Sequence, residues 1–333
     1  MGVLTCSPKD GIFPFMDKKL KIGVVCICLN PPYWQFISEM LWGLDTFFLK
    51  HSSIRDKYET EFMAWSDIPE KPEEIQQKLA EFLVRCGEAK TSLISQESVE
   101  IIVESNKRQD IEKQILGLLN IRNKVKVFPV ESIEWPMPTL MRYHLFLQQE
   151  EYLKNFDYVF YIDADMRITD WVGEEILGDG LTASQHPMYA LRRNYQPPYE
   201  PNHESSAYIP RPGRIIEEDG KKKFESLYYA GGFQGGKTED FIKAMKEMRK
   251  NIDDDFTRNY IAIWNDETHW NKYLFNNPPK VVLNPSYIYP DSLVAEYYVK
   301  LWGRNYSPKI MTLTKSFTVS KEAGQQVSKM LSI

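Results

Sequence analysis

The sequence lacks any long apolar run. No stretch approaches the roughly eighteen consecutive apolar residues that a membrane span needs. The first twenty residues include Pro8, Lys9, Asp10 and Pro14 and have no apolar core of the kind found in signal peptides. We therefore expect the chain as given to contain no membrane span.

Cysteines are few, and neither sign of charge dominates. The four cysteines are Cys6, Cys26, Cys28 and Cys86. Cys26 and Cys28 share one face of a predicted strand but lie too far apart along it to pair conveniently. No Cys-x-x-Cys spacing indicates zinc, so buried reduced thiols are expected. The net charge of −5 gives no support for binding to nucleic acid.

The first half of the chain alternates between strand and helix patterns. Apolar runs at 21–29 and 61–66 and a short run at 124–130 predict strands, and Tyr158–Ile162 reads as a buried parallel strand. Helices are predicted over 34–49 and 141–153, and residues 70–120 have the composition of peripheral helices. This alternation predicts an α/β fold with a Rossmann-like, mostly parallel sheet flanked by helices.

The second half is less regular and rich in proline. A hairpin is expected around Asp219-Gly220, and helices are expected over 237–249 and 268–275. Between them lies Ala230-Gly-Gly-Phe-Gln-Gly-Gly236, whose spacing matches no phosphate-binding motif. Paired glycines of this kind either allow backbone to approach a ligand closely or form tight turns.

Two acids follow the last strand of the first half, in Asp163-Ala164-Asp165. Open α/β sheets bind ligands outside the carboxyl ends of their strands. Adjacent carboxylates repel each other unless a cation or solvent separates them, which favours a divalent metal that holds a phosphorylated ligand. The alternative is an exposed turn with two ordinary acids.

A second candidate is the segment from Trp264 to Tyr273. Asp266 and Glu267 stand at the first turn of a predicted helix, where the helix dipole favours acids. An ordinary helix cap explains them completely. The surrounding mixture of Trp264, His269, Trp270 and Asn271 is instead typical of sugar-binding surfaces.

Taken in order, four segments resemble glycosyltransferase family 6, the retaining enzymes that make α1,3-linked galactose or N-acetylgalactosamine and include the histo-blood-group A and B transferases. The segments are Asp163–Met166 with its continuation Val172–Leu177, Ser206–Pro210, Tyr228–Phe233 with Gly235-Gly236, and Trp264–Tyr273. The resemblance runs from about Trp135 to Tyr287 and is weaker elsewhere. It implies a GT-A fold, a UDP-sugar donor and Mn²⁺, with Mg²⁺ as the alternative metal.

The resemblance also implies how the donor is held. Asp163 and Asp165 would bind a metal that bridges the two phosphates, a role that suits hard oxygen ligands. Arg142, seven residues after Trp135, would contact the donor. Ile27 and Tyr33 would hold uracil.

Further roles follow from the same resemblance. Asp266 would bond to hydroxyls of the donor sugar, and His186 and Trp264 would contact the acceptor. Glu267 matches a carboxylate proposed either as nucleophile or as electrostatic partner of the transition state, so double displacement and front-face attack both stay open. Lys315 and Lys321 resemble basic residues of a C-terminal tail that folds over pyrophosphate, or are solvated surface lysines.

Donor choice is expected to depend on Ala230, Gly231 and Gly232, which occupy the segment where the family tunes it. Small residues leave room for a 2-acetamido group, which favours UDP-GalNAc over UDP-Gal. The acceptor would be a glycan on an oligosaccharide, glycolipid or glycoprotein, with a fucosylated galactoside such as the H antigen favoured by analogy. A UDP-sugar-binding or glycan-binding protein without transfer activity is the alternative function, and a metal-dependent nucleotidyltransferase or phosphatase is a third.

The resemblance suggests four regions and two departures. Residues 1–20 form an N-terminal segment, 21–165 the nucleotide-sugar-binding half, 166–300 the half that binds donor sugar and acceptor, and 301–333 a closing tail. Residues 68–122 exceed the family's linker and are expected to be a helical insertion. The Golgi anchor of vertebrate members is not found here, which predicts a cytoplasmic, bacterial or phage-like form unless an anchor was removed.

Overall fold

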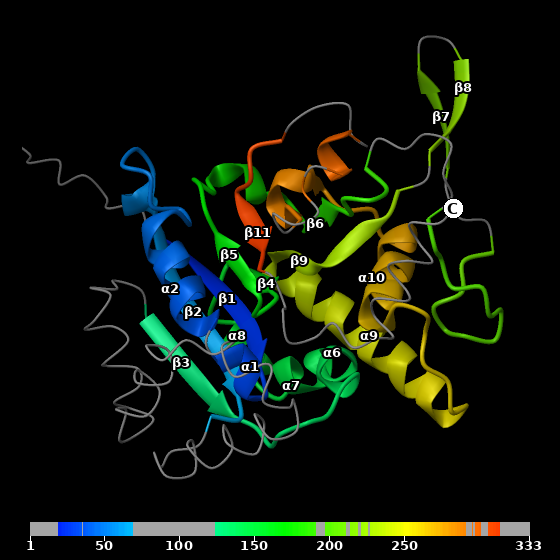
Figure 1. Ribbon diagram of the computed structural model, residues 1–333, viewed down its shortest axis with the longest axis horizontal. Helices are drawn as coiled ribbons and strands as arrows, with labels where there is room; N and C mark the ends of the chain where they lie inside the picture. The colour runs from blue at the N-terminus through cyan, green and yellow to red at the C-terminus, as the bar shows by residue number, and fades with distance from the viewer. Residues whose placement is uncertain are drawn as a thin grey trace, which may run out of the picture.

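A seven-stranded sheet forms the centre of the described structure. The computed structural model describes residues 19–34, 36–68, 124–190, 197–210, 214–218, 221–225, 227–290, 295, 297–300 and 306–313. Within these residues the strand order is β10-β6-β9-β4-β1-β2-β3 (Figure 1). The strands are β1 Leu20–Cys28, β2 Tyr58–Ser66, β3 Lys124–Pro129, β4 Tyr158–Ile162, β6 Leu181–Gln185, β9 Tyr229–Lys237 and β10 Val281–Leu283.

All of these strands run in one direction except β9. Parallel pairs join β3, β2, β1 and β4, and β10 is parallel to β6. Strand β9 lies between β4 and β6 and is antiparallel to both. The chain therefore has the mostly parallel, helix-flanked sheet that the sequence predicts, and this arrangement is consistent with a GT-A-like fold.

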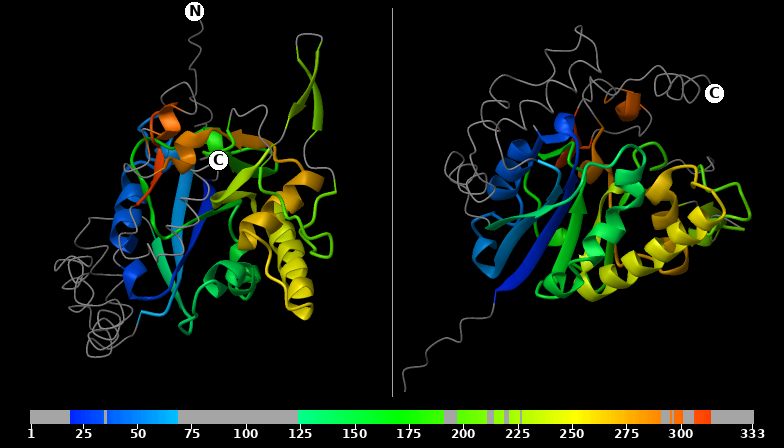
Figure 2. Two further views of the ribbon diagram at one scale, coloured as in Figure 1. Left: turned by 45° about the vertical axis from the view of Figure 1, so that its right-hand side comes forward. Right: turned by 90° about the horizontal axis from the view of Figure 1, so that it is seen from below.

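Helices cover both faces of the sheet. One face packs against α2, and the opposite face packs against α7, α9 and α10 (Figure 2). The helices are α1 Pro31–Trp34, α2 Phe36–Thr46, α6 Met137–Leu140, α7 Arg142–Leu147, α8 Glu150–Leu153, α9 Thr238–Thr257 and α10 Asn265–Asn276. Short 3₁₀ helices are η1 Arg55–Lys57, η3 Glu174–Ile176 and η4 Pro285–Ile288.

The alternation of side chains along β1 builds two hydrophobic cores. Val24 and Cys26 point to the α2 side, where they join Leu41. Val25 and Ile27 point to the other side. Both faces of the strand are buried, which is why its sequence is a nearly unbroken apolar run. The thiols of Cys26 and Cys28 are free and buried, as expected, whereas Cys6 and Cys86 lie outside the described residues.

Several sequence expectations are confirmed, with shifted boundaries. β4 has the predicted bounds, and β2 begins at Tyr58, earlier than expected. The helix expected over 34–49 is α1 and α2, which end at Thr46. The helix expected over 141–153 is broken at Gln149, whose backbone leaves the helical region (φ −112°, ψ 26°). From residue 69 on, the expected insertion lies outside the described residues.

The glycine-rich segment is a central strand rather than a pair of turns. Its glycines allow close backbone approach within the sheet. A Cβ on Gly235 would lie 2.3 Å from the Val159 carbonyl oxygen, and one on Gly236 would lie 2.3 Å from the Gly180 carbonyl oxygen. Gly236 also has a φ of +134°, a conformation that side chains disfavour. Glycines here therefore permit β9 to insert between β4 and β6.

The expected hairpin is confirmed. β7 Arg214–Glu218 pairs antiparallel with β8 Lys221–Glu225, from Arg214–Glu225 to Glu218–Lys221. It projects from the rest of the molecule in both Figure 1 and Figure 2. The two residues that link its strands lie outside the described residues.

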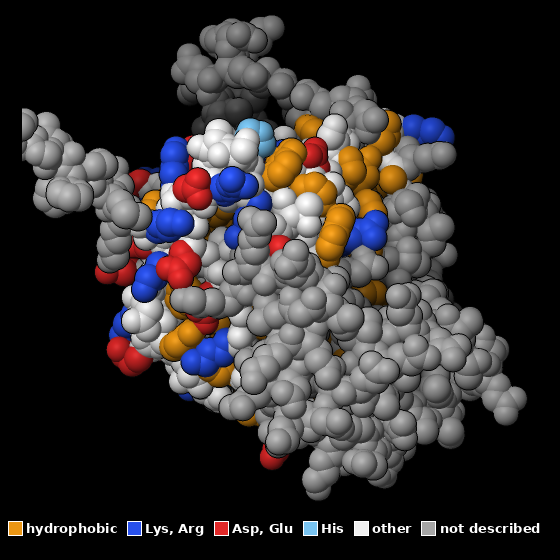
Figure 3. All heavy atoms as spheres, turned by 90° about the vertical axis from the view of Figure 1, so that its left-hand side faces the viewer, with side chains coloured by type: hydrophobic (Ala, Val, Ile, Leu, Met, Phe, Trp, Pro, Cys, Tyr) orange, Lys and Arg blue, Asp and Glu red, His pale blue; other side chains and the backbone are white. Residues whose placement is uncertain are grey.

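Aromatic contacts tie α2 to the chain that follows β5 Met166–Ile168. The ring of Phe47 meets Trp42 edge to face at 5.4 Å between centroids and Trp171 at 5.6 Å. Trp42 and Trp171 are both partly exposed. On the described part of the face in Figure 3, such hydrophobic groups are interspersed with charged side chains.

Among the described residues, no helix combines the length and apolar character that a membrane span requires.

The last described strand, β11 Ile310–Thr312, pairs antiparallel with β5. Glu175 helps to hold this region. Its Oε1 accepts bonds from the Tyr287 hydroxyl and the Lys309 Nζ, each at 2.6 Å, and from the Gly173 N–H at 3.0 Å. Although burial opposes the charged form, the bonds from Lys309 and Tyr287 prevail and lower the pKa of Glu175 to about 2.

We expect Glu175→Gln to lower the Tm at pH 7, and we expect this difference from the parent to shrink in acid. A carboxyl with a depressed pKa stabilises the fold above its ordinary pKa of 4.5, and that contribution is lost as the pH falls towards 2. Thermal melts between pH 7 and pH 3 measure it. Glu151→Gln, at an exposed carboxylate, is the control and should leave the Tm unchanged. A difference that stays constant with pH would contradict the assignment.

Candidate active site

The carboxyl ends of β4 and β6 meet the amino end of β9 at one edge of the sheet. This happens because β9 runs against its two neighbours. The N–H of Asp163 donates to the Gly232 carbonyl at 2.9 Å, and the N–H of His186 donates to the Tyr228 carbonyl at 3.0 Å. The Asp-x-Asp segment and the glycine-rich segment, far apart in sequence, therefore lie side by side.

Helix α10 is fastened to the same edge by Asn271. Its Oδ1 accepts from the N–H of Tyr229 at 2.8 Å, and its Nδ2 donates to the Tyr229 carbonyl at 2.8 Å. Nδ2 also lies 2.8 Å from the Glu267 carbonyl oxygen, to which it donates. The buried amide thus pairs with Tyr229 as a neighbouring strand would. This contact brings the first turn of α10, with Asp266 and Glu267, against β9.

Arg142, the first residue of α7, is the buried cation of the site. Its side chain is only 5% exposed, and Nη1 lies 3.2 Å from the Asp266 Oδ2. Nη2 lies 3.5 Å from the Asp163 Oδ1, and the guanidinium stacks over the Tyr161 ring at 4.2 Å from its centroid. Burial lowers the pKa of Arg142, but Asp266 and Asp163 outweigh it, so the net shift is upward and the group stays charged.

Asp266 and Glu267 have strongly perturbed pKa values. Burial raises the pKa of Asp266 to about 7, opposed by Arg142 and reinforced by Asp163. Burial also raises the pKa of Glu267 to about 7, against the lowering effect of the Gly231 N–H and of Tyr228. The Gly231 N–H donates to the Glu267 Oε2 at 2.8 Å. These acids are therefore part of a desolvated site, which an exposed helix cap does not explain.

The two acids of the Asp-x-Asp segment differ in surroundings. Asp163 is half-buried and accepts a bond at Oδ1 from the Tyr161 hydroxyl. Asp165 is 5% exposed, and its carbonyl accepts from the N–H of Leu313 at 2.7 Å. The described chain therefore ends beside these acids. Lys315 and Lys321 lie outside the described residues.

The donor set of these acids suits a hard divalent cation, because carboxylate oxygens are the ligands that Mn²⁺ and Mg²⁺ prefer. The described residues contain no cluster of three or more His, Cys, Asp or Glu placed to hold a metal ion. Two protein carboxylates would thus leave most coordination positions to the ligand and to water.

The candidate uracil residues lie on the neighbouring strand and helix. Ile27 is near the carboxyl end of β1, 8% exposed and packed in the core on the α7 side. Tyr33 is on α1, and its carbonyl accepts from the Cys28 thiol at 3.1 Å. Burial, with a smaller effect of Asp163, raises the pKa of Tyr33 to about 12. Tyr33 is thus electrostatically coupled to the Asp-x-Asp segment.

The three small residues of β9 have different neighbours. Ala230 is buried, 3% exposed. A Cβ on Gly231 would lie 3.3 Å from the Cβ of Glu267 and 3.5 Å from the Asp266 Oδ2. A Cβ on Gly232 would lie 2.3 Å from the Met166 Cε and 2.7 Å from the Asp163 Oδ2. Gly231 therefore faces the acids of α10, and Gly232 faces the Asp-x-Asp segment.

The candidate acceptor residues flank this edge. The Nδ1 of His186 accepts from the N–H of Met188 at 3.2 Å, and burial lowers the pKa of His186 to about 4. His186 is therefore neutral at physiological pH. Trp264 precedes α10, and its N–H donates to the Thr268 Oγ1 at 2.9 Å. The indole Nε1 of Trp264 is buried and has no hydrogen-bond partner among the described residues.

Partly buried polar contacts attach residues 197–210 to α10 and to the segment just before it. Glu200 accepts from the Tyr260 hydroxyl at 2.6 Å and from the N–H of Ile263 at 2.9 Å, immediately before Trp264. Lys272 donates to the Tyr208 carbonyl at 2.7 Å. The Ser206–Pro210 motif is thereby placed next to the helix that carries Asp266 and Glu267.

Sequence reasoning missed the residues that support the site, above all Tyr161, Gln234 and Asn271. Gln234 stands in the glycine-rich segment, where a polar residue between apolar and glycine neighbours is the signal that could have found it. Asn271 belongs to a segment typical of sugar-binding surfaces, but nothing in that segment indicates that it bonds to β9. Neither residue shows its partners in the sequence, because Asn271 bonds to the backbone of Tyr229, 42 positions away, and Gln234 accepts from the hydroxyl of Tyr143, 91 positions away.

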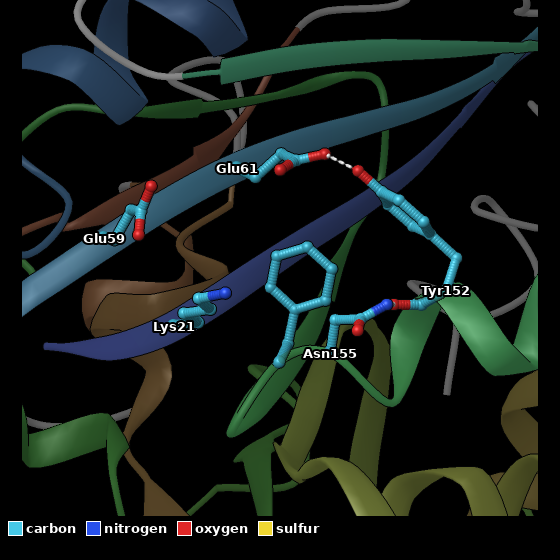
Figure 4. A pocket seen from close by; sticks show the side chains of 6 residues that line it. Lys21, Glu59, Glu61, Tyr152 and Asn155 are labelled. Carbon is cyan, nitrogen blue, oxygen red and sulfur yellow. Dashed lines mark hydrogen bonds between the residues drawn. The ribbon is translucent and has the colours of Figure 1, made fainter. Parts of the chain in front are cut away.

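A separate hollow of about 240 Å³ lies at the opposite edge of the sheet, near the amino ends of β1 and β2 (Figure 4). It is lined by Lys21, Glu59, Glu61, Tyr152, Asn155 and Phe156. The Tyr152 hydroxyl donates to the Glu61 Oε1 at 2.5 Å. None of the candidate site residues lines it, and it is on the wrong edge for ligands of a parallel sheet.

A family model for glycosyltransferase family 6 matches residues 115–309, more than half of the chain. The chain therefore belongs to glycosyltransferase family 6.

Individual relatives are similar to only part of the chain. Histo-blood group ABO system transferase 1 of Rattus norvegicus is 34% identical over 146 residues, 44% of this chain and 38% of the relative. Globoside alpha-1,3-N-acetylgalactosaminyltransferase 1 of Homo sapiens is 31% identical over 138 residues, 41% of this chain and 36% of the relative. The chain thus matches less than half the length of these mammalian proteins. O-antigen biosynthesis glycosyltransferase WbnI of Escherichia coli is 28% identical over 192 residues, 57% of this chain and 73% of the relative.

We expect Arg142→Met to lower the free energy of unfolding by about 3–5 kcal/mol, because it leaves buried carboxylates without their cation. Adding Asp266→Asn should restore part of this loss, since the neutral amide needs no counter-charge. Urea unfolding at pH 7.5 measures both. Arg249→Met, which removes an exposed ion pair to Asp253, is the control and should cost less than about 0.5 kcal/mol. Equal losses for the single and double variants would contradict this account.

Proposed function

We propose that this protein is a retaining hexosyltransferase that moves GalNAc, in preference to Gal, from a UDP-sugar to the 3-OH of a galactoside acceptor resembling the H antigen. The observation that supports this most is the meeting of Asp163, Gly231 and Glu267 at one sheet edge around the buried Arg142. The printed names of the relatives, which include an alpha-1,3-N-acetylgalactosaminyltransferase, favour the same reaction.

In this proposal the Asp-x-Asp segment holds the diphosphate. Asp163 and Asp165 would hold Mn²⁺, or Mg²⁺ in its place, next to the phosphates of the donor. The bound cation supplies stabilisation of the charge that develops on departing UDP. Arg142 and Tyr161 support this role because they fix the Oδ1 of Asp163. Ile27 and Tyr33 hold the uracil.

The donor sugar lies between β9 and the first turn of α10. Asp266 accepts from its hydroxyls, and Gly231 lets β9 approach Glu267 closely, since a Cβ there would lie 3.3 Å from the Glu267 Cβ. The small residues at Ala230, Gly231 and Gly232 favour the 2-acetamido group of GalNAc over unsubstituted galactose. A larger residue at Gly232 would crowd the Met166 Cε and the Asp163 Oδ2, so Gly232→Met should shift preference towards UDP-Gal or abolish turnover.

Transfer breaks the bond between C1 of the sugar and the β-phosphate oxygen and forms a bond between C1 and the acceptor oxygen. In front-face attack the hydroxyl proton passes to the departing phosphate, and Glu267 stabilises the positive charge on the sugar. In double displacement Glu267 first forms an ester at C1, and the acceptor then replaces it with the same net retention. The desolvated carboxyl group of Glu267 is compatible with both mechanisms.

His186 and Trp264 contact the acceptor in this proposal. The nucleotide then binds to region 21–165, and the donor sugar and acceptor bind to region 166–300. Region 301–333 is the closing tail that carries Lys315 and Lys321. A UDP-sugar-binding or glycan-binding protein without turnover is the second candidate, and it is favoured only if the site binds donor and releases no UDP.

Release of UDP with Mn²⁺, measured with and without a fucosylated galactoside acceptor, tests the function. We expect acceptor-dependent release, a higher kcat/KM for UDP-GalNAc than for UDP-Gal, and an α1,3-linked product by NMR. A higher kcat/KM for UDP-Gal would overturn the donor assignment. Calorimetric binding of donor without release would favour the second candidate.

We expect the double substitution Asp163→Asn with Asp165→Asn to remove the dependence on Mn²⁺ and to lower kcat about a hundredfold or more, because amides bind the cation poorly. Titration of activity against Mn²⁺ measures both effects. Asp170→Asn is the matched control, since this nearby acid bonds to the N–H of Trp171 and has no assigned role. Unchanged turnover in the double variant would contradict the metal assignment.

A further inference from the structure

Gln234 is a buried polar residue in the central strand of the sheet. It is 1% exposed and lies in register with Tyr161 on β4 and Ala183 on β6. Burying an amide without partners costs about 1–3 kcal/mol, so a strand centre normally carries an apolar residue. The bonds that Gln234 makes are therefore the feature to explain.

Both ends of the amide are satisfied, and its orientation is fixed by chemistry. The Gly231 carbonyl oxygen can only accept, so the group 2.9 Å from it must be the Nε2 donor. The Oε1 then faces the buried hydroxyl of Tyr143, which donates to it at 3.2 Å. A chain of bonds thus runs from α7 through Gln234 to the start of β9.

Gly231 lies where the regular sheet ends. The ladder of β9 with β4 ends at Phe233, opposite Ile162, and its ladder with β6 shifts register after Ala183. At this point side chains bond to the Gly231 backbone in place of a neighbouring strand. The carbonyl of Gly231 accepts from Gln234, and its N–H donates to Glu267. These two groups belong to successive peptide planes joined at a glycine, the residue whose backbone rotates most freely.

Arg142 also reaches the Gly231 carbonyl, but only at 3.4 Å, while it lies 3.2 Å from Asp266 and 3.5 Å from Asp163. The bond from Gln234 is the shorter one, and its donor is not shared with a carboxylate in the described residues. Without the bond from Gln234, the Gly231 carbonyl would rely on the 3.4 Å contact from Arg142, whose guanidinium also pairs with Asp266 and Asp163.

We propose that Gln234 is a positioning residue: by holding the Gly231 carbonyl it restricts backbone rotation at this glycine, which keeps the N–H of the same residue directed at Glu267 and holds that carboxylate in place for sugar transfer. This inference rests on the proposed function, because that function places Glu267 at the reaction centre. Gln234 itself touches neither donor nor acceptor. Its effect should therefore appear in kcat rather than in KM.

The kinetic test is Gln234→Leu, which keeps the volume of the side chain and removes its hydrogen bonds. We expect kcat for UDP-GalNAc transfer to fall about tenfold to a hundredfold, because small misplacements at a reaction centre are costly. The KM for the donor should stay within about threefold. Gln234→Met provides the same comparison if the leucine variant folds poorly.

Two further variants separate positioning from general stability. Thr182→Val removes another buried bond, which the Thr182 Oγ1 on neighbouring β6 donates to the Ile176 carbonyl of η3, and should lower Tm without lowering kcat. Tyr143→Phe removes the bond that orients Gln234 and should lower kcat less than Gln234→Leu does. The double variant should be no slower than Gln234→Leu, since Tyr143 acts through Gln234. A kcat loss in Gln234→Leu no larger than in Thr182→Val would overturn the proposal.

The amide proton of Gly231 provides a test that needs no turnover. In NMR spectra of the full chain, Gln234→Leu should shift this proton upfield and speed its exchange with solvent, while Thr182→Val should leave both unchanged. An unchanged Gly231 amide would overturn the positioning role even in an active enzyme. Absence of UDP release by the parent protein would instead overturn the proposed function, while the amide measurement still decides what Gln234 holds.

Discussion

The buried charge of Arg142 is the interaction on which the arrangement of the site depends. A guanidinium that is 5% exposed is tolerable only beside carboxylates, and Asp266 and Asp163 could not be brought together without a cation between them. These three residues come from α7, from α10 and from the end of β4. One interaction therefore fixes two helices and a strand relative to each other, at the edge where ligands of parallel sheets bind.

The antiparallel strand β9 is the second constraint, and it brings segments that are far apart in the sequence into contact. Because β9 enters the sheet against its neighbours, its first residues lie at the carboxyl ends of β4 and β6. Side chains then bond to backbone groups near the start of β9. Asn271 bonds to the backbone of Tyr229, and Gln234 bonds to Gly231. The same residues that finish the sheet thus hold the strand beside Glu267, and each of them uses both its amide oxygen and its amide nitrogen.

Much of the fold could be predicted from the sequence, and particular residues show why. β1 and β4 are nearly continuous apolar runs because both faces of each strand are buried, so their pattern is visible locally. β9 was not predicted as a strand because its glycines look like turns until the strands on either side are known. The break of the predicted helix at Gln149 was also missed, since nothing in its own residue type requires it.

By itself the sequence determined the family and the order of the motifs, since these depend on residue identity along the chain and the family match bears them out. It also determined which residues could carry charge at the end of β4 and at the start of α10. Only the tertiary structure decided that Arg142 lies between those acids, that Gly231 rather than Gly232 faces Glu267, and that Gln234 is satisfied. The physical reason is that burial and hydrogen bonding depend on partners such as Arg142 and Gly231, which are 89 positions apart and which no local pattern encodes.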